Sequence, residues 1–434
     1  MCTRVTLRFL TAALLSAFLL LPRAVMPAQV SQPDYWPQWR GPEATGVAPD
    51  ADPPATWSET ANIRWKVPIP GRGSGSPIVW GDKVFVLTAV SDTGQAVEGV
   101  MHHFIVMALD RATGEVVWRQ VAREEAPHEA THRQNGTYAS ASPVTDGEVL
   151  IANFESRGMY AYDLDGNLIW SKDLGDKHMR NQFGEGSTPA LHGNTLVHVW
   201  DQLGGQSFVI ALDKRTGEEL WRRDREEIDT WATPLIVEVN GRAQAIVPAM
   251  ERIESYDLET GEIVWESDGL TMNVIPSPVY EDGLAILMSG YRGNAVKAID
   301  LSKAHGDITG TDAIVWSYDR DTPYVPSPLL YDGILYMLKS NNGILTAFNA
   351  RTGDIYYGTQ RLDGIGEVFS SPVGAGGRVY ITSRDGHTLV LRNGETFEVL
   401  GSNSLDDGFD ASPAIAGGEI YMRGYNNLYC IAED

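Results

Sequence analysis

An alternation of apolar stretches and turn-forming residues recurs along the chain. In its clearest copy, residues 108–118, an apolar strand leads to Asp110 and a turn at Thr113 and Gly114, and a second apolar strand ends on Trp118. Asp bonds its own backbone in such turns and Gly accepts a positive φ, so the pattern predicts a β-hairpin. Other copies end on Trp170, Trp221, Trp265, Trp316 and, more loosely, Tyr357.

A second marker, a small residue followed by proline, divides the chain at similar intervals. The prolines are Pro77, Pro143, Pro189, Pro234, Pro278, Pro328, Pro372 and Pro413. Most intervals are about 40 to 50 residues, the length of a four-stranded propeller blade. The first interval is longer because an insertion at 88–102 lies inside it. The eight markers therefore predict eight blades.

The two ends of the repeat region complement each other. Residues 62–68 resemble the last strand of a blade, including its Trp65, whereas residues 412–431 supply three strands and then stop. Sharing one blade would pair these ends and remove open sheet edges. The sequence thus predicts an all-β fold over residues 62–434, an eight-bladed β-propeller of four-stranded antiparallel blades closed by the N-terminal strand.

The aromatic residue that ends each repeat is too large for an exposed strand end. Its expected role is structural, because a large ring buried between neighbouring blades removes much apolar area from water. The residues predicted to dock in this way are Trp65, Trp118, Trp170, Trp221, Trp265, Trp316 and Tyr357.

The chain begins with a segment typical of export. Arg4 and Arg8 precede an apolar run at 9–21, which is too short to span a bilayer comfortably. A cleaved secretory signal peptide is therefore predicted over residues 1–28, with no membrane span after cleavage and a periplasmic or extracellular location. Cys2 precedes the apolar run, so it is not placed like the acylated cysteine of a lipoprotein.

A proline-rich arm is predicted over residues 29–61. Its proline density excludes a regular element, and its Trp36 and Trp39 are expected to be covered. We expect the arm to pack on the propeller, with a position along a side or rim favoured over the alternative that it plugs one end of the axial channel.

Composition narrows the partners. The formal charge of −23 disfavours nucleic acid, whose binding needs a basic footprint. After signal cleavage Cys430 is the single cysteine left, so no internal disulfide is expected. Separately, we expect the protein to be a monomer.

Strand order sorts the loops onto two faces when strands A to D run outward from the axis. The A–B and C–D turns share one face and are short and uniform, whereas the B–C loops and D–A links share the other face and are long and varied. Polar and aromatic residues that converge there are typical of a binding site. The candidate contacts are Arg72, His132, Asn135, Tyr138, Asn181, Glu185, Asp229, Trp231, Tyr291, Arg292, Tyr324, Arg384, Asp410, Arg423 and Tyr425.

Motifs for chemistry are weak. His128 and His132 lie near acidic residues, but a solvated loop is favoured over a metal site. No nucleophile elbow occurs, so no catalytic residue is assigned. Residues 163–167 resemble the start of a calcium loop but occupy a hairpin turn.

The repeat phrase Ala-x-Asp-x-x-Thr-Gly-x-x-x-Trp, at 108–118 and 211–221, resembles the tryptophan-docking motif of quinoprotein propellers. With the segments 36–42 and 131–140, it resembles most the secreted PQQ-binding-like β-propeller repeat proteins of the quinoprotein alcohol dehydrogenase-like superfamily. That superfamily includes quinone-dependent alcohol dehydrogenases and the outer-membrane protein assembly factor B, a scaffold without chemistry.

The sequence departs from the dehydrogenases at the features that the resemblance would require for activity. It lacks their adjacent cysteines, a haem-attachment motif and a recognisable calcium ligand set. We therefore favour an exported, non-catalytic scaffold that uses no cofactor and binds a protein, peptide or glycan partner of the cell envelope on the B–C/D–A face. Charge reversal of Arg292 and Arg423 is expected to weaken this binding without unfolding the ring.

The alternative is a PQQ-dependent oxidoreductase, similar to alcohol or sugar dehydrogenases. The quinone and calcium would lie on the propeller axis, with a carboxylate such as Glu185 or Asp229 as acid or base.

Overall fold

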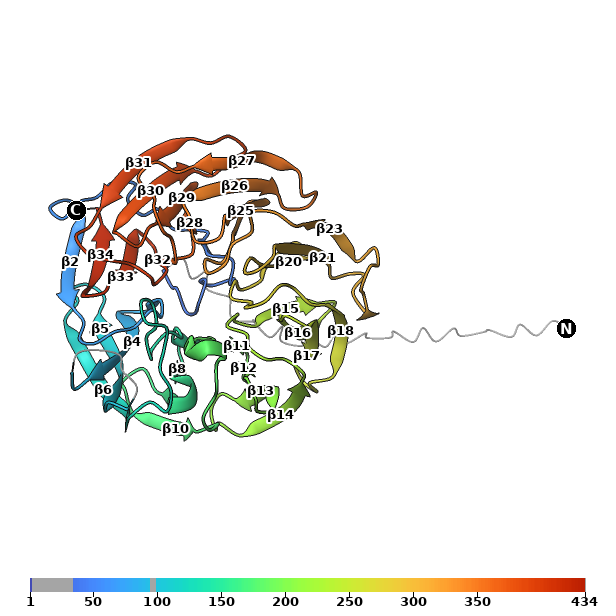
Figure 1. Ribbon diagram of the computed structural model, residues 1–434, viewed down its shortest axis with the longest axis horizontal. Helices are drawn as coiled ribbons and strands as arrows, with labels where there is room; N and C mark the ends of the chain where they lie inside the picture. Colours follow the sequence, from blue (N-terminus) through green and yellow to red (C-terminus); the bar gives the residue numbers. More distant parts are fainter. Residues whose placement is uncertain (2–33, 94–98, 434) are drawn as a thin grey trace. The chain divides into compact units, whose positions relative to one another are not determined.

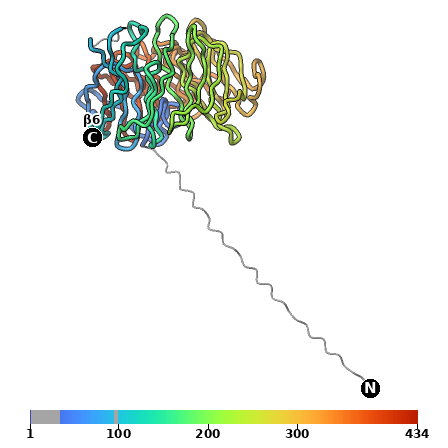
Figure 2. The backbone as a smooth tube through the Cα atoms, turned by 90° about the horizontal axis from the view of Figure 1, so that it is seen from below, coloured from blue at the N-terminus to red at the C-terminus, as the bar shows by residue number. Residues whose placement is uncertain are grey.

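The structure, a computed structural model, describes Met1, residues 34–93 and residues 99–433. Within these residues, eight sheets surround a common axis (Figure 1). Figure 2 shows the ring from the side, with the strands running between its two faces. The predicted eight-bladed propeller of four-stranded antiparallel blades is therefore confirmed. The signal peptide predicted for residues 1–28 lies, except for Met1, outside the described residues.

In the first four blades, strands A to D follow each other in chain order. Blade 1 consists of β3 (Ile78–Trp80), β4 (Lys83–Ser91), β5 (His102–Asp110) and β6 (Val116–Glu125). Blade 2 consists of β7 (Val144–Thr145), β8 (Leu150–Asn153), β9 (Met159–Tyr162) and β10 (Leu168–Lys172). Blade 3 consists of β11 (Ala190–His192), β12 (Thr195–Trp200), β13 (Ser207–Asp213) and β14 (Glu219–Arg225). Blade 4 consists of β15 (Leu235–Val239), β16 (Arg242–Val247), β17 (Arg252–Asp257) and β18 (Ile263–Asp268).

The other four blades complete the ring. Blade 5 consists of β19 (Val279–Glu281), β20 (Leu284–Ser289), β21 (Ala295–Asp300) and β23 (Ile314–Tyr318). Blade 6 consists of β24 (Leu329–Tyr331), β25 (Ile334–Leu338), β26 (Ile344–Asn349) and β27 (Ile355–Arg361). Blade 7 consists of β28 (Val373–Ala375), β29 (Arg378–Thr382), β30 (His387–Arg392) and β31 (Val399–Ser404). Blade 8 consists of β32 (Ala414–Ala416), β33 (Glu419–Arg423), β34 (Asn427–Ala432) and β2 (Ile63–Pro68).

Strand β2 closes the ring as the sequence predicts. It pairs antiparallel with β34, in a register that places Trp65 opposite Cys430. Short 3₁₀ segments, η1 (Glu155–Arg157) and η2 (Arg180–Gln182), lie in the loops of the B–C/D–A face. Within the described ranges, no helix has the length and apolar character needed to cross a bilayer.

Indole rings connect neighbouring blades in most of the repeats. The Trp118 N–H donates to the carbonyl oxygen of Leu164 in blade 2 at 3.0 Å, and a Cβ on Gly166 would lie 2.7 Å from the ring. The glycine of the next turn therefore leaves room for the indole. The N–H groups of Trp65, Trp170, Trp221 and Trp316 likewise donate to backbone oxygens of the following blade.

Trp265 in blade 4 differs from these tryptophans. Its N–H donates to Gln244 Oε1 of its own blade at 2.8 Å. The next blade has an insertion in place of the short turn, and the insertion contains β22 (Gly306–Asp307), which pairs parallel with β18 beside Trp265. The inserted chain covers this indole completely.

The N-terminal arm lies in the axial channel as well as on the flank of the ring. Trp36 pairs with Val79 of β3, and β1 (Val47–Ala48) pairs parallel with β28. Trp57, farther along the arm, is buried, and its backbone N–H donates to the side-chain oxygen of Asn403 on the flank of blade 7 at 2.8 Å.

Trp39 and Arg40 carry the arm across the channel. Trp39 Nε1 donates to Ser277 Oγ at 3.0 Å, and the buried Arg40 guanidinium donates to the carbonyl oxygens of Pro372, Pro328 and Thr45 at 2.7, 2.6 and 3.2 Å. For these two residues the structure shows the less favoured alternative, a position in the channel, in place of the side or rim. The carbonyls that precede the inner strands need donors, and a guanidinium supplies several from one side chain.

Candidate functional site

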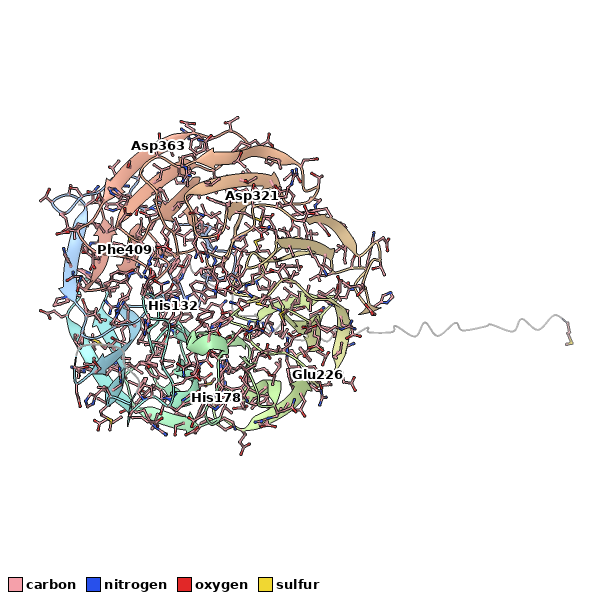
Figure 3. All side chains as sticks on the ribbon, viewed as in Figure 1. His132, His178, Glu226, Asp321, Asp363 and Phe409 are labelled. Atoms are coloured by element: carbon pink, nitrogen blue, oxygen red, sulfur yellow. The ribbon has the colours of Figure 1, made fainter. Side chains whose placement is uncertain are left out.

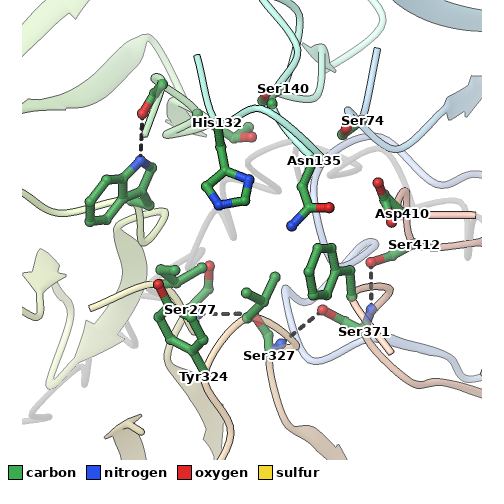
Figure 4. Close-up of a pocket in the computed structure, with 18 of the residues that line it drawn as sticks. Ser74, His132, Asn135, Ser140, Ser277, Tyr324, Ser327, Ser371, Asp410 and Ser412 are labelled. Atoms are coloured by element: carbon green, nitrogen blue, oxygen red, sulfur yellow. Dashed lines mark hydrogen bonds between the residues drawn. The ribbon is translucent and has the colours of Figure 1, made fainter. Parts of the chain in front are cut away.

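A cavity of about 360 Å³ lies on the axis, next to Trp39 (Figure 4). Apart from Trp39 and Asn341, which is in a B–C loop, every lining residue lies in a D–A link. The cavity thus belongs to the face on which the sequence places the candidate contacts. Its size falls within the range of small-molecule sites, roughly 300 to 1,000 Å³.

The floor of the cavity is a ring of hydroxyl groups. Each marker proline follows Ser or Thr, and the hydroxyl oxygen of one blade accepts the backbone N–H of the blade before it. Six such bonds of 2.8 to 3.2 Å connect Ser76 to Ser142, Ser142 to Thr188, Thr233 to Ser277, Ser277 to Ser327, Ser327 to Ser371 and Ser371 to Ser412. The ring ties the inner strands together and lines the channel with oxygen atoms.

Aromatic side chains form much of the wall. Phe183, Trp231, Tyr324 and Phe369 line the cavity and come from different D–A links. Trp231 is held by its N–H, which donates to the Gly184 carbonyl at 2.8 Å. Tyr324 stacks on Tyr291 with 4.8 Å between ring centroids. These contacts fix the rings before any ligand arrives.

Glu185 is the most perturbed acid of the wall. Its carboxylate accepts the Ser156 backbone N–H at 2.9 Å and the Ser156 hydroxyl at 2.5 Å. Burial, together with the neighbouring carboxylate of Glu155, raises the pKa of Glu185 to about 7. Behind it, Glu155 is buried against Lys177 Nζ at 3.3 Å and His198 Nε2 at 3.1 Å. Glu185 therefore titrates near neutral pH.

The other acids of the wall share one arginine. Arg384 Nε donates to Asp410 Oδ1 at 2.6 Å, and its Nη1 donates to Glu367 Oε2 at 3.0 Å. Its guanidinium also lies 4.4 Å from the centroid of Phe369. Burial raises the pKa of Asp410. Arg384 itself does not line the cavity, whose lining contains no Lys or Arg and three acids, Glu185, Glu367 and Asp410.

Two buried side-chain polar atoms of the lining residues have no hydrogen-bond partner in the described part of the chain. They are His132 Nδ1 and Asn135 Oδ1. Figure 4 shows both side chains pointing toward the middle of the cavity. Buried polar atoms are nearly always bonded in proteins, so these atoms are suited to a ligand or water.

The structure brings six of the fifteen candidate contacts to the cavity. They are His132, Asn135, Glu185, Trp231, Tyr324 and Asp410. Tyr291 and Arg384 contact this set from behind, and Arg72 lies over the ring of Tyr425, whose hydroxyl accepts a hydrogen bond from Arg384.

The remaining candidates lie away from the cavity. The Tyr138 hydroxyl donates to the Glu129 carbonyl at 3.0 Å, and Asn181 is exposed in η2. Asp229 is buried 2.8 Å from Arg180 Nε, and Arg292 is exposed.

Arg423 requires a correction. It is 2% exposed, and its guanidinium donates to the Gly424 carbonyl at 2.7 Å. A charge reversal there would bury a carboxylate beside a carbonyl oxygen and would destabilise the ring. The expectation that reversal at Arg423 leaves the fold intact was therefore wrong, whereas Arg292 is still suitable for that test.

Sequence reasoning missed several lining residues. Phe183, Ile275 and Val325 carry no chemical signal and were not singled out. The hydroxyl ring could have been predicted, because all eight marker prolines follow Ser or Thr in the sequence. The sequence predicts that Trp39 is covered, but it does not place this residue in the channel.

One group of possible metal ligands occurs in the described residues. Ligand atoms of His128, Glu129 and His178 lie within 4.8 Å of one another, and Figure 3 shows His178 farther from the ring's centre than His132. His128 Nδ1 accepts a hydrogen bond from Arg157 at 2.5 Å, and its Nε2 lies 2.9 Å from the Lys177 carbonyl. Both ring nitrogens of His128 have hydrogen-bond partners, and the guanidinium cation of Arg157 lies beside them. This arrangement does not suit a metal ion.

The cavity does not match the charge of pyrroloquinoline quinone, which carries several carboxylate groups. The lining offers three acids and no Lys or Arg to such a ligand. Calcium would need free carboxylates, yet Glu185 and Asp410 are already bonded to Ser156 and Arg384. The residues present therefore do not fit this cofactor.

Comparisons with known proteins agree on the fold. Residues 51–202 and 205–434 match the family model described as outer membrane protein assembly factor BamB. The protein of that name from Francisella salina is 31% identical over 107 residues, which are 25% of this chain and 18% of that protein. The crystal structure of BamB from Moraxella catarrhalis has a TM-score of 0.60 at 14% identity and covers 85% of this chain and 98% of that one.

A crystal structure of quinohemoprotein alcohol dehydrogenase from Comamonas testosteroni has a TM-score of 0.65 at 10% identity, and it covers 93% of this chain and 81% of that one. At such identities both structural likenesses show the fold alone. The aligned segment spans less than a fifth of the Francisella protein.

Proposed function

Because this chain belongs to the family of the outer membrane protein assembly factor BamB, we propose that it is a non-catalytic scaffold that binds a partner on its B–C/D–A face. The partner would be a protein, peptide or glycan of the cell envelope. Export to the periplasm or beyond follows from the signal peptide predicted for residues 1–28.

The cavity at the centre of this face is the observation that supports the proposal. It combines fixed aromatic rings with polar atoms that lack partners, as at His132 Nδ1. A closed ring holds these groups in place, so binding would cost little ordering entropy.

Capture from an envelope fraction tests the proposal. Immobilised wild-type protein is compared with Trp231→Ala, which removes a ring from the cavity wall, and with the matched control Trp80→Ala. Trp80 is also half-buried, stacks on Tyr35 at 4.5 Å and lies outside the cavity. We expect Trp231→Ala to reduce capture about tenfold or more, as for a central aromatic contact, and Trp80→Ala to leave it unchanged. Equal capture by all three proteins would remove this face from consideration.

The alternative is a quinone-dependent oxidoreductase, with which the chain shares a fold through the Comamonas enzyme, although the cavity residues do not fit the quinone. Titration with pyrroloquinoline quinone and calcium, followed by dye-linked alcohol oxidation, distinguishes the two functions. Stoichiometric binding with turnover would establish the enzyme, and the scaffold proposal predicts neither.

A further inference from the structure

We propose that the axial cavity binds a neutral sugar unit, either as a free saccharide or as the end of a glycan. This inference rests on the proposed function, because it names the part of a partner that the cavity would take. It is carried by the distribution of donors, acceptors, aromatic faces and charge around the cavity.

The floor supplies hydrogen-bond donors. The hydroxyl oxygens of Ser142, Ser371 and Ser412 each accept a backbone N–H from a neighbouring blade. A hydroxyl that accepts in this way still has its own proton to donate. Within the described residues no acceptor takes these protons, and all three side chains line the cavity, with Ser371 and Ser412 labelled in Figure 4. The floor therefore presents O–H donors to a ligand.

The wall supplies acceptors. Glu185, Glu367 and Asp410 line the cavity from three links and carry carboxylate acceptors, and the buried Asn135 Oδ1 has no partner in the described chain. A ligand group between floor and wall must accept from one and donate to the other. A sugar hydroxyl does both, with one proton and two lone pairs.

The aromatic rings supply apolar faces between these polar groups. Trp231, Tyr324 and Phe369 stand around the cavity, and the first two are fixed by a hydrogen bond to Gly184 and by stacking on Tyr291. A sugar ring has C–H faces that pack on such surfaces while its edge carries hydroxyls. The volume of about 360 Å³ accommodates a small saccharide.

The charge of the lining disfavours an anion, and the unused donors of the floor disfavour a cation. An anion would meet three acids and no lysine or arginine in the lining. An organic cation would suit the acids and rings, but Arg384 already neutralises part of the charge of Asp410 and Glu367, and the donor ring of the floor would stay unused. A neutral ligand rich in hydroxyls uses all three kinds of group.

Calorimetric titration of the full chain tests the inference. The probes are maltose, cellobiose and N,N′-diacetylchitobiose, with choline and digalacturonate as the cationic and anionic comparisons. We expect saturable binding of at least one neutral disaccharide at or below about 10 mM, the weak end of specific binding, and none of the charged probes. Heat of binding from choline or digalacturonate alone, or from none of the five, would overturn the assignment.

Variants assign the binding to the cavity. Trp231→Ala should weaken binding about tenfold or more, whereas Trp80→Ala should leave it unchanged. Asn135→Ala is a second variant, because Asn135 Oδ1 makes no internal hydrogen bond in the described residues. Its loss should weaken binding about fivefold without lowering the unfolding temperature. Equal affinity in wild type, Trp231→Ala and Asn135→Ala would place the sugar elsewhere and contradict the inference.

Titration with a longer oligomer of the same sugar distinguishes a free saccharide from a glycan as the source of the sugar unit. Equal affinity for the disaccharide and the oligomer indicates a free saccharide or a single terminal unit, and tighter binding of the oligomer indicates a glycan that extends along the face. If no saccharide binds while capture from the envelope still depends on Trp231, the sugar assignment fails and the scaffold function stands. If no saccharide binds and capture does not depend on Trp231, both the sugar assignment and the scaffold function fail.

Discussion

At one end of the axial channel, Arg40 is buried and donates to three carbonyl oxygens, whereas at the other end His132 Nδ1 and Asn135 Oδ1 have no partner among the described residues. We call these the arm end and the loop end. Burial lowers the pKa of Arg40 to about 9, so it remains charged at neutral pH, where carbonyl dipoles hold it. Most donors of the Arg40 guanidinium are therefore bonded within the fold at the arm end, although its Nε has no partner in the described chain, whereas the loop end has a buried imidazole nitrogen and a buried amide oxygen without one.

Replacing the central donor of the arm end should have the largest effect. Arg40→Met keeps the side-chain volume but leaves the carbonyls of Pro328, Pro372 and Thr45 without their donor. At about 1 to 3 kcal/mol for each buried group, the free energy of unfolding should fall by about 4 kcal/mol. Chemical denaturation measures this change. A loss below about 1 kcal/mol would mean that water replaces the guanidinium and that the arm end is not closed.

Removing an indole that connects two blades should have the next largest effect. Trp118→Ala deletes the bond to Leu164 and empties the space above Gly166, at a cost of about 3 kcal/mol, the lower end for Trp because the ring is half-buried. Thermal and chemical unfolding measure it, with saccharide titration as the comparison, since affinity at the loop end should not change. A negligible loss would contradict the docking role predicted for this residue.

Removing the titrating acid of the loop end should stabilise the protein, but only above a certain pH. The folded-state pKa of Glu185 is about 7 against an ordinary value of 4.5. Between these values the folded state binds more protons than the unfolded state, so wild-type stability falls as pH rises through this window. Glu185→Gln lacks this titration and should be more stable than wild type by about 1 to 2 kcal/mol at pH 8 and equal to it at pH 4. Denaturation at both pH values checks the difference, and an equal effect at the two would contradict it.

The smallest effect on stability is expected at the rim of the loop end. Arg292 is exposed, and its guanidinium lies 5.5 Å from the Tyr291 ring centroid. Arg292→Glu should change the free energy of unfolding by less than about 0.5 kcal/mol, as surface substitutions usually do. Capture from the envelope fraction should still fall a few-fold because a rim charge steers association. Unchanged capture would restrict binding to the cavity itself.

The repeat pattern was sufficient to predict the ring. Apolar strands, Asp-Gly turns and regularly spaced prolines specify blades locally, and the relation to PQQ-like propellers and to BamB is confirmed by the family match. Trp265 shows that the local sequence pattern does not determine every contact. The repeat motif around it matches the others, but an insertion in the next blade gives its indole a different hydrogen-bond partner.

The site could be predicted less completely, because burial is not a property of residue type. Arg423 and Arg292 look equivalent in a polar loop, yet one is buried and the other exposed. Likewise, the sequence does not show that Trp39 reaches Ser277, more than two hundred residues away. Strand order places the D–A links on one face, but the distances that make a cavity depend on the closed ring.

The pairing of β2 with β34 has a consequence for the life of the chain in the cell. Strand β2 precedes every other strand of the blades, and its partner β34 follows all of them in the chain. During synthesis the ring therefore stays an open arc with two unpaired edges until β34 has emerged, and such edges recruit other chains. Closure of blade 8 acts as a test of completeness: a prematurely terminated chain would keep its edges and be open to proteases, whereas a full-length chain must break this long-range seam before it can unfold.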